Sequence, residues 1–261
     1  MNKFYLILIS LLFLSMFSNA GSFKAPSKQY FELRVYHTAD TQQIITIEHF
    51  LQTAFVPALH RLGINKVGVF KAVANDTAAD KKIYVLIPFS SLKEIENFRE
   101  KLNNDKEFNE AGKAFLETTY DKPDYLRYET IVLRAFEKWP QVTVPHLTGA
   151  KSDRIYELRS YEGPTDKLYQ NKVQMFNKGG ETEIFQRLGF NAVFYGEVLF
   201  GSHMPNLMYM TSFENKASRE EHWKTFGSDP EWKQLSALPE YQHNVSKAEI
   251  TFLIPEEFSD L

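Results

Sequence analysis

The sequence contains no cysteine among its 261 residues. This absence excludes disulfide bonds, thiolate nucleophiles, cysteine-ligated zinc and thiol redox chemistry. The net charge is -3, and no run of lysines or arginines is present. A nucleic-acid-binding protein usually carries a clustered basic footprint. We therefore expect no nucleic-acid partner.

The common catalytic motifs are also missing. The chain has no H-E-x-x-H, G-x-S-x-G, Walker or G-x-G-x-x-G sequence, which argues against metalloenzymes, common hydrolases and nucleotide-dependent enzymes. Its seven histidines lack metal-ligand spacing. His49 and His60 share a predicted helix face, but they lie about 16 Å apart along its axis, too far to share an ion. We expect no metal site and no cofactor.

Residues 1–20 have the composition of a secretory signal peptide. Lys3 provides a positive charge, an apolar run follows from Phe4 to Phe17, and small residues end the stretch at Ala20. The run is shorter than the roughly 20 residues that span a bilayer. The pattern predicts cleavage after Ala20 and an exported, periplasmic or extracellular protein. No later segment is predicted to span a membrane.

Four segments occur twice, in the same order, at an offset of 124 to 126 residues. The clearest pair is Y30-F-E-L-R-V-Y36 and I155-Y-E-L-R-S-Y161. So long a period does not fit a solenoid repeat, so each copy is expected to be a whole domain. The sequence predicts one module at 28–136, a linker rich in proline and glycine at 137–153, and a second module at 154–255.

Each copy has the same predicted order of elements, strand-helix-strand-strand-helix-strand. The helices are recognised by apolar residues at spacings of three and four, and they end at Gly63 and Gly189. Pro57 and the Gly179-Gly180 pair interrupt these helices at matching places. This order is that of the ferredoxin-like α+β fold. We expect two such tandem modules to close a barrel within one chain.

The repeated first strand alternates charged and apolar residues, so its two faces differ. We expect Phe31, Leu33 and Val35 to lie under the helices. The polar face would then line the space between the two sheets. The candidate ligand-binding residues are Glu32, Arg34, Tyr36, Glu157, Arg159 and Tyr161, together with Glu197 and Tyr209 on neighbouring strands.

Two interpretations of this polar face stay open. Because a buried charge is costly unless it is paired, the face could be a structural ion-pair network that fixes how the modules dock. It could instead hold a small polar or anionic molecule, since buried polar groups are also good site candidates.

The loop from Glu197 to Asn206 differs between the copies. It contains Gly201 and His203, whereas the first copy has a plain polar turn at 75–81. A loop that varies on a repeated scaffold is a reasonable place for function. His203 is therefore the candidate catalytic acid or base. The alternative is a hairpin loop whose histidine only caps a turn or packs on a neighbour.

Several motifs of the second copy resemble the NIPSNAP family. They are the stretches Tyr156–Tyr161, Met204–Phe213, Arg219–Phe226 and Asp229–Trp232. The first copy matches more loosely, with Phe108 in place of the final tryptophan. The resemblance implies modules of the dimeric α+β barrel superfamily, which includes cofactor-independent oxygenases, haem-handling enzymes and proteins that only bind.

Three functions follow as hypotheses. The first is a protein that binds a small molecule between its sheets. The second is an oxygenase- or isomerase-type enzyme, with His203 as acid or base and Arg159 holding an anionic substrate. The third is a structural or interaction protein without a small-molecule site. A homo-oligomer is compatible with each of them.

Overall fold

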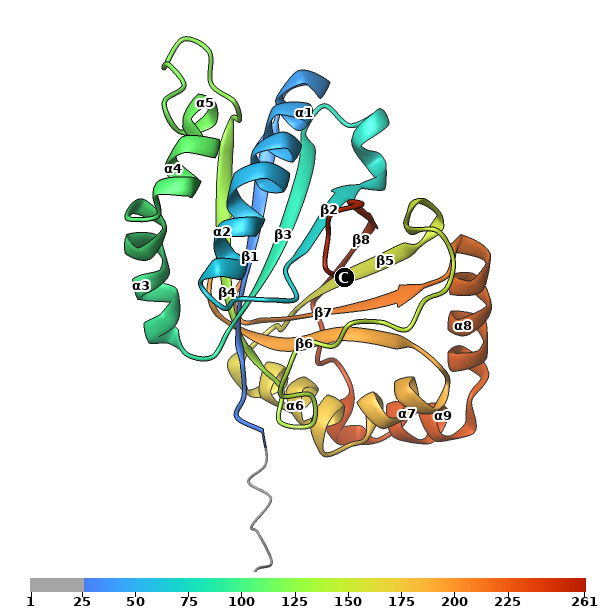
Figure 1. Cartoon of the computed structure of the whole chain (residues 1–261). Helices are drawn as coiled ribbons and strands as arrows, with labels where there is room; N and C mark the ends of the chain where they lie inside the picture. Colours follow the sequence, from blue (N-terminus) through green and yellow to red (C-terminus); the bar gives the residue numbers. More distant parts are fainter. Residues whose placement is uncertain (1–25) are drawn as a thin grey trace, which may run out of the picture.

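The computed structural model describes residues 26–261 (Figure 1). The signal-peptide prediction lies outside these residues. The first half of the chain contains β1 (Tyr30–Thr38), α1 (Thr41–Phe50), a π-helical turn η1 (Leu51–Phe55), α2 (Val56–Arg61), β2 (Gly68–Ala72), β3 (Lys81–Phe89), α3 (Leu92–Asn103), α4 (Lys106–Ala111), α5 (Lys113–Leu116) and β4 (Arg127–Ala135). The second half contains β5 (Ile155–Glu162), α6 (Asp166–Asn177), α7 (Glu181–Arg187), β6 (Asn191–Phe200), β7 (Asn206–Phe213), α8 (Lys216–Ser228), α9 (Pro230–Ser236) and β8 (Lys247–Pro255).

The eight strands form one closed barrel in the order β1-β3-β2-β8-β5-β7-β6-β4, and all the neighbouring strands that pair are antiparallel. The helices of the two halves cover different sides of its outer surface (Figure 1). The predicted α+β fold with a closed barrel is therefore confirmed. The halves meet at two seams, where β2 pairs with β8 and β4 pairs with β6.

Apolar side chains from both halves fill the barrel. Phe31, Leu33 and Val35 pack with Tyr156 and Leu158 in one buried cluster. The predicted orientation of the first strand is therefore wrong: its apolar face points into the barrel, and the Glu/Arg/Tyr face points toward the helices. The physical reason is that the interior is enclosed by strands alone. In the second half, α8 brings Arg219 and Trp223 to the charged face, where both donate to Glu157.

Local sequence signals explain where the helices begin and end. Asp40 and Ser91 cap α1 and α3 by accepting backbone hydrogen bonds, and Asn215 does the same for α8. Gly63 and Gly189 follow their helices at φ angles of 79° and 77°, where a side chain would be strained. These helix stops agree with the prediction from sequence.

The C-terminal residues 256–261 run along β2 and extend the short β2–β8 seam. The backbone N–H groups of Glu256 and Asp260 donate to the carbonyl oxygens of Val69 and Val67 at 2.9 and 3.0 Å. Leu261 is buried in the barrel cluster. The tail therefore helps to hold the two halves together. No helix between residues 26 and 261 combines the length and apolar character needed to cross a membrane.

Candidate functional site

The predicted Glu/Arg/Tyr residues form the same network in each half. On β1, Arg34 donates from Nε and Nη2 to Glu32 Oε1 at 2.9 and 2.6 Å and from Nη1 to the Tyr36 hydroxyl at 3.3 Å. On β5, Arg159 Nε donates to Glu157 Oε1 at 2.6 Å, and its Nη1 donates to the hydroxyl of Tyr161 at 2.9 Å. Each strand therefore presents one arginine held between an acid and a tyrosine.

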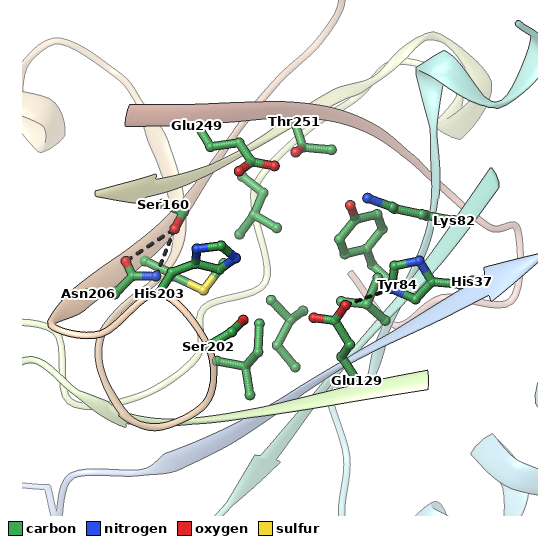
Figure 2. Close-up of a pocket in the computed structure, with 15 residues that line it drawn as sticks. His37, Lys82, Tyr84, Glu129, Ser160, Ser202, His203, Asn206, Glu249 and Thr251 are labelled. Atoms are coloured by element: carbon green, nitrogen blue, oxygen red, sulfur yellow. Dashed lines mark hydrogen bonds and ion pairs between the residues drawn. The ribbon is translucent and has the colours of Figure 1, made fainter. Parts of the chain in front are cut away.

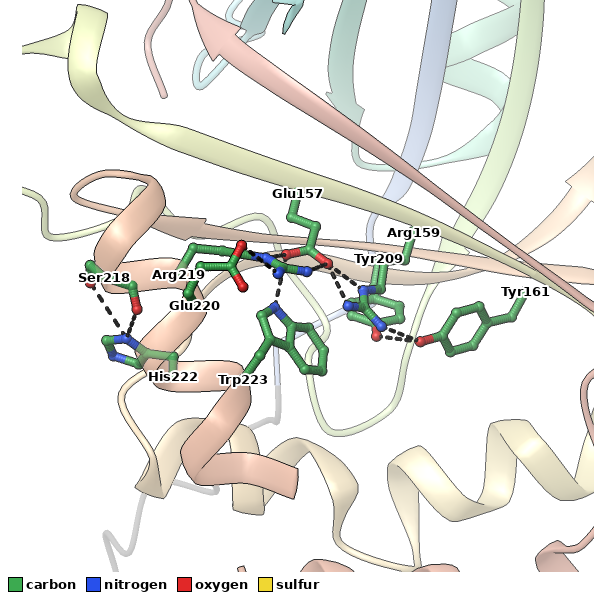
Figure 3. A network of polar contacts seen from close by, with 9 residues as sticks. All are labelled: Glu157, Arg159, Tyr161, Tyr209, Ser218, Arg219, Glu220, His222 and Trp223. Atoms are coloured by element: carbon green, nitrogen blue, oxygen red, sulfur yellow. Dashed lines mark hydrogen bonds and ion pairs between the residues drawn. The ribbon is translucent and has the colours of Figure 1, made fainter. Parts of the chain in front are cut away.

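In the second half, α8 closes this network (Figure 3). Arg219 Nε and Trp223 Nε1 donate to Glu157 Oε2 at 2.7 and 2.8 Å. The indole ring of Trp223 stacks on the guanidinium of Arg159, whose carbon lies 3.6 Å from the ring centroid. Both oxygens of this fully buried carboxylate are thus satisfied. The predicted residue Tyr209 joins through its hydroxyl, 2.9 Å from that of Tyr161.

The electrostatics of Glu157 agree with this pairing. Burial opposes its ionisation, but the hydrogen bonds and charges of Arg219 and Arg159 outweigh burial and lower the pKa of its carboxyl. A charged, paired and covered carboxylate contributes to stability and has no free atom for a ligand. The structural interpretation of the polar face therefore fits the second half.

In the first half, the corresponding helix α3 lacks the closing residues. Counted from the caps Ser91 and Asn215, Ile95 occupies the position of Arg219, and Arg99 that of Trp223. Isoleucine has no side-chain donor, and Arg99 is exposed. Glu32 is 1% exposed, and its Oε2 has no hydrogen-bond partner among the described residues. Leaving such an acceptor unpaired costs about 1–3 kcal/mol or more for a charged group.

A cavity of about 260 Å³ lies beside this network, between the sheet and the helices of the first half. We call it the helix-side cavity. It is lined by Arg34, Tyr36, Phe50, Phe55, Phe98, Arg99, Leu102, Asn103, Phe108, Phe115, Leu116, Tyr125 and Tyr128. A dry apolar cavity of about 150 Å³ already accommodates benzene. The helix-side cavity is therefore large enough for a small aromatic molecule.

Sequence differences between the halves account for the space. Leu102 and Phe108 occupy the positions of Phe226 and Trp232, counted from the same helix caps. Val85 pairs with Arg34 where the second half has Tyr209 opposite Arg159. Each change replaces a larger side chain with a smaller one. Burial opposes the charge of Arg34, but Tyr36 and Glu32 raise its pKa overall, so the cavity keeps a charged guanidinium.

A second cavity, of about 140 Å³, lies at one end of the barrel between strands of the two halves (Figure 2). We call it the barrel-mouth cavity. Its floor is apolar, with Leu33, Val35, Ile131, Leu158 and Met208, and its rim is polar, with His37, Lys82, Tyr84, Glu129, Ser160, Ser202, His203, Asn206, Glu249 and Thr251. Burial raises the pKa of Tyr84 to about 12, so this hydroxyl stays protonated at neutral pH. Unlike the helix-side cavity, this cavity matches the predicted location between the two halves of the barrel.

Histidines stand on opposite sides of this mouth (Figure 2). His37 is buried, with Nδ1 2.9 Å from Asp80 Oδ1 and Nε2 2.9 Å from Glu129 Oε1. The side chain of His203 is 56% exposed, and its Nδ1 lies 3.3 Å from Glu162 Oε1. Carboxylates therefore hold the ring of His37 on both sides, and one carboxylate lies beside His203.

The structure does not bring the predicted catalytic pair together. His203 lines the barrel mouth beside Ser160, whereas the neighbouring Arg159 faces the helices and stacks on Trp223. Successive residues of a strand point to opposite faces, so the two side chains serve different sites. Glu197 also lies apart, in an ion pair of 3.1 Å with Arg134 at the β4–β6 seam.

The contacts of Arg219 and Trp223 with Glu157 were not predicted from the sequence, nor was the position of Arg99 beside the helix-side cavity. The tryptophan was visible as a motif, and a position-by-position comparison of α3 with α8 would have shown that the first half lacks it. No group of three or more residues able to hold a metal ion occurs within 26–261.

These features define the class of the protein. An eight-stranded antiparallel barrel with helices outside is shared with a proposed monooxygenase from Lactobacillus acidophilus NCFM, at a TM-score of 0.58 and 12% identity over 88% of this chain and 94% of that one. A proposed monooxygenase from Fusobacterium nucleatum gives a TM-score of 0.56 and 7% identity, over 88% and 93%. At these identities the likeness is one of fold, the α+β barrel.

Residues 156–260 match the NIPSNAP family model, so the second half carries a NIPSNAP domain, as its motifs indicated. A NIPSNAP-like domain protein from Burkholderia xenovorans is 18% identical over 41% of this chain and 90% of that chain, with a TM-score of 0.38. No curated protein matches the chain.

Proposed function

We propose that this protein binds a small, largely apolar molecule in the helix-side cavity of its first half. The observation that carries the proposal is the difference between the halves. Trp223 covers the Glu/Arg/Tyr network in the second half, whereas in the first half a cavity lies beside Arg34 and Tyr36 of that network. A site that one copy closes and the other leaves open is suited to an exchangeable occupant.

The lining supports a ligand with an apolar body and one polar end. Aromatic side chains such as Phe55 and Tyr128 form the walls, and their rings also flank the guanidinium of Arg34 at 5.0 and 5.1 Å. Arg99 and Asn103 supply polar groups from α3. A few placed polar groups in an apolar cavity are typical of small-molecule sites. The sequence predicted a site between the two sheets, whereas the proposed site lies between the sheet and the helices of the first half.

We also propose that each half of the chain is a separate ferredoxin-like module. The strand orders β4-β1-β3-β2 and β8-β5-β7-β6 support two tandem ferredoxin-like modules within 28–136 and 154–255, joined by the linker 137–153. We also propose that the protein is exported after cleavage near Ala20, on the composition of residues 1–20.

A cofactor-independent oxygenase reaction in the same cavity is the second candidate. The two barrel structures named as proposed monooxygenases favour testing it, although their likeness concerns the fold alone. Oxygen consumption in the presence of a bound ligand would distinguish an enzyme from a binding protein. His203 belongs to the barrel-mouth cavity and remains a candidate acid or base for a ligand there.

The test compares two variants of the full chain. The double variant I95R/R99W introduces the closing residues of the second half into the first, and His203→Ala alters only the barrel mouth. Native mass spectrometry should detect a retained small molecule in the wild type and in the His203→Ala variant, but not in I95R/R99W. A molecule retained by I95R/R99W and lost from the His203→Ala variant would instead assign binding to the barrel mouth and contradict the proposal.

A further inference from the structure

The helix-side cavity has an unbalanced positive charge. Among the described residues, two with a charged side chain line it, Arg34 and Arg99, and no aspartate or glutamate does. Arg34 is paired with Glu32 at 2.6 Å, so its charge is balanced within the protein. Arg99 forms no ion pair with any residue between 26 and 261. The lining therefore favours a ligand with a negative charge, whereas a cation would be repelled.

The polar side chains of α3 indicate which anionic group fits. Arg99 and Asn103 lie one turn apart, on the same face of the helix, and both line the cavity. A guanidinium binds a carboxylate through two parallel N–H donors, and the amide of asparagine adds a further donor. This part of the wall is therefore suited to a carboxylate.

The remaining walls are largely aromatic. They are formed by Tyr36, Phe50, Phe55, Phe98, Phe108, Phe115, Tyr125 and Tyr128, with Leu102 and Leu116. The rings of Phe50 and Phe115 stack with their centroids 4.0 Å apart. In the second half a ring of the protein itself, that of Trp223, lies on Arg159 at 3.6 Å. A flat aromatic ligand would extend this kind of packing, which contributes beyond the burial of area.

These observations name a class of ligand for the proposed function, on which this inference rests. We propose that the helix-side cavity binds aromatic monocarboxylates, flat apolar ring systems that carry one carboxylate. The ring system lies among the aromatic walls, and the carboxylate accepts hydrogen bonds from Arg99. The proposal requires no reaction and no cofactor.

The experiment uses isothermal titration of the full chain at pH 7 with four probes. Naphthalene-1-acetate, naphthalene-1-acetamide and 1-naphthylmethylamine share one ring system and carry a negative, a neutral and a positive group. Octanoate has the carboxylate on a flexible aliphatic chain. We expect naphthalene-1-acetate to bind about fivefold or more tightly than the acetamide, and the amine and octanoate to bind more weakly than naphthalene-1-acetate.

Variants of α3 locate the charged contact. Arg99→Met should remove the preference for naphthalene-1-acetate over the acetamide, and Arg99→Glu should make the amine the tighter of the two charged naphthalene probes. Lys101→Glu is the matched control, because it makes the same change of charge on the same helix at an exposed residue that does not line the cavity. This control should keep the wild-type order of affinities. I95R/R99W should abolish binding of all four probes, and circular dichroism should show that each variant is folded.

The inference and the proposed function fail in different ways. If the three naphthalene probes bind the wild type equally and I95R/R99W abolishes their binding, the carboxylate is not recognised, and the ligand class is wrong while the cavity remains the site. Octanoate binding as tightly as naphthalene-1-acetate would contradict the aromatic body. If Lys101→Glu changes the order of affinities as Arg99→Glu does, or no probe binds the wild type, the inference is overturned. Absence of any retained molecule in native mass spectrometry would separately overturn the proposed function.

Discussion

Trp223 donates its indole N–H to Glu157 at 2.8 Å, while its ring covers Arg159. In the second half, an aromatic side chain of the protein itself thus covers the acid and the arginine. The first half keeps the acid and the arginine but not the tryptophan. The same network therefore has different surroundings in the two halves: α8 covers it in the second half, and a cavity lies beside it in the first half.

The first prediction concerns the hydrogen bond of Trp223. Trp223→Phe keeps an aromatic ring but removes the donor to a buried carboxylate, so the free energy of unfolding should fall by about 1–3 kcal/mol. Trp139→Phe is the matched control, because Trp139 Nε1 is buried without a hydrogen-bond partner among the described residues. Urea denaturation should show a larger loss for Trp223→Phe. Equal losses would mean that only ring packing matters.

The second prediction concerns acid stability. Despite the opposing effect of burial, Arg219 and Arg159 lower the pKa of Glu157 below its ordinary value of 4.5. This group therefore contributes stability that is fully present above pH 4.5 and is lost as pH falls through the lowered pKa. Arg219→Met removes part of the lowering, so the midpoint of acid unfolding should move to higher pH. Arg127 is an exposed arginine at the start of β4, so the midpoint of the control variant Arg127→Met should match that of the wild type.

The third prediction concerns the variant I95R/R99W, which places on α3 the residue types that α8 has at Arg219 and Trp223. I95R/R99W should satisfy Glu32 Oε2 and fill the helix-side cavity, which should stabilise the ligand-free chain by about 1–2 kcal/mol. For a protein of this size that corresponds to a rise of roughly 2–8 °C in melting temperature. Differential scanning calorimetry gives the shift directly. A fall in melting temperature would show that the walls of the two sites are not equivalent.

Local signals explain the part of the fold that the sequence predicted. The alternation of β1, the cap at Ser91 and the stop at Gly63 each act within a few residues. These signals led to the order of strands and helices that the structure has, whereas the closed barrel was expected from the repeat. They also identified Glu157 and Arg159 as unusual, and the two do form a buried network.

The orientation of the strand depended on partners far along the chain. Alternation separates two faces but does not say which one turns inward, and Arg219 and Trp223 lie 62 and 66 residues from Glu157. The helix-side cavity was harder to predict, because it arises where the first half has smaller side chains than the second half. Nothing in the sequence around Arg99 indicates a site, and its position becomes informative only when it is compared with Trp223 on α8.

The last prediction concerns the C-terminal tail and the β2–β8 seam. β2 and β8 pair over three residues, and the tail adds hydrogen bonds to Val67 and Val69. Removing residues 256–261 should therefore increase hydrogen exchange at the amides of these two valines, which donate to side chains of the tail. The amide of Phe136, which donates to Tyr195 at the other seam, is the internal control and should keep its protection. Equal loss at both seams would mean that the barrel opens as one unit, and no loss at either would mean that β2 and β8 hold without the tail.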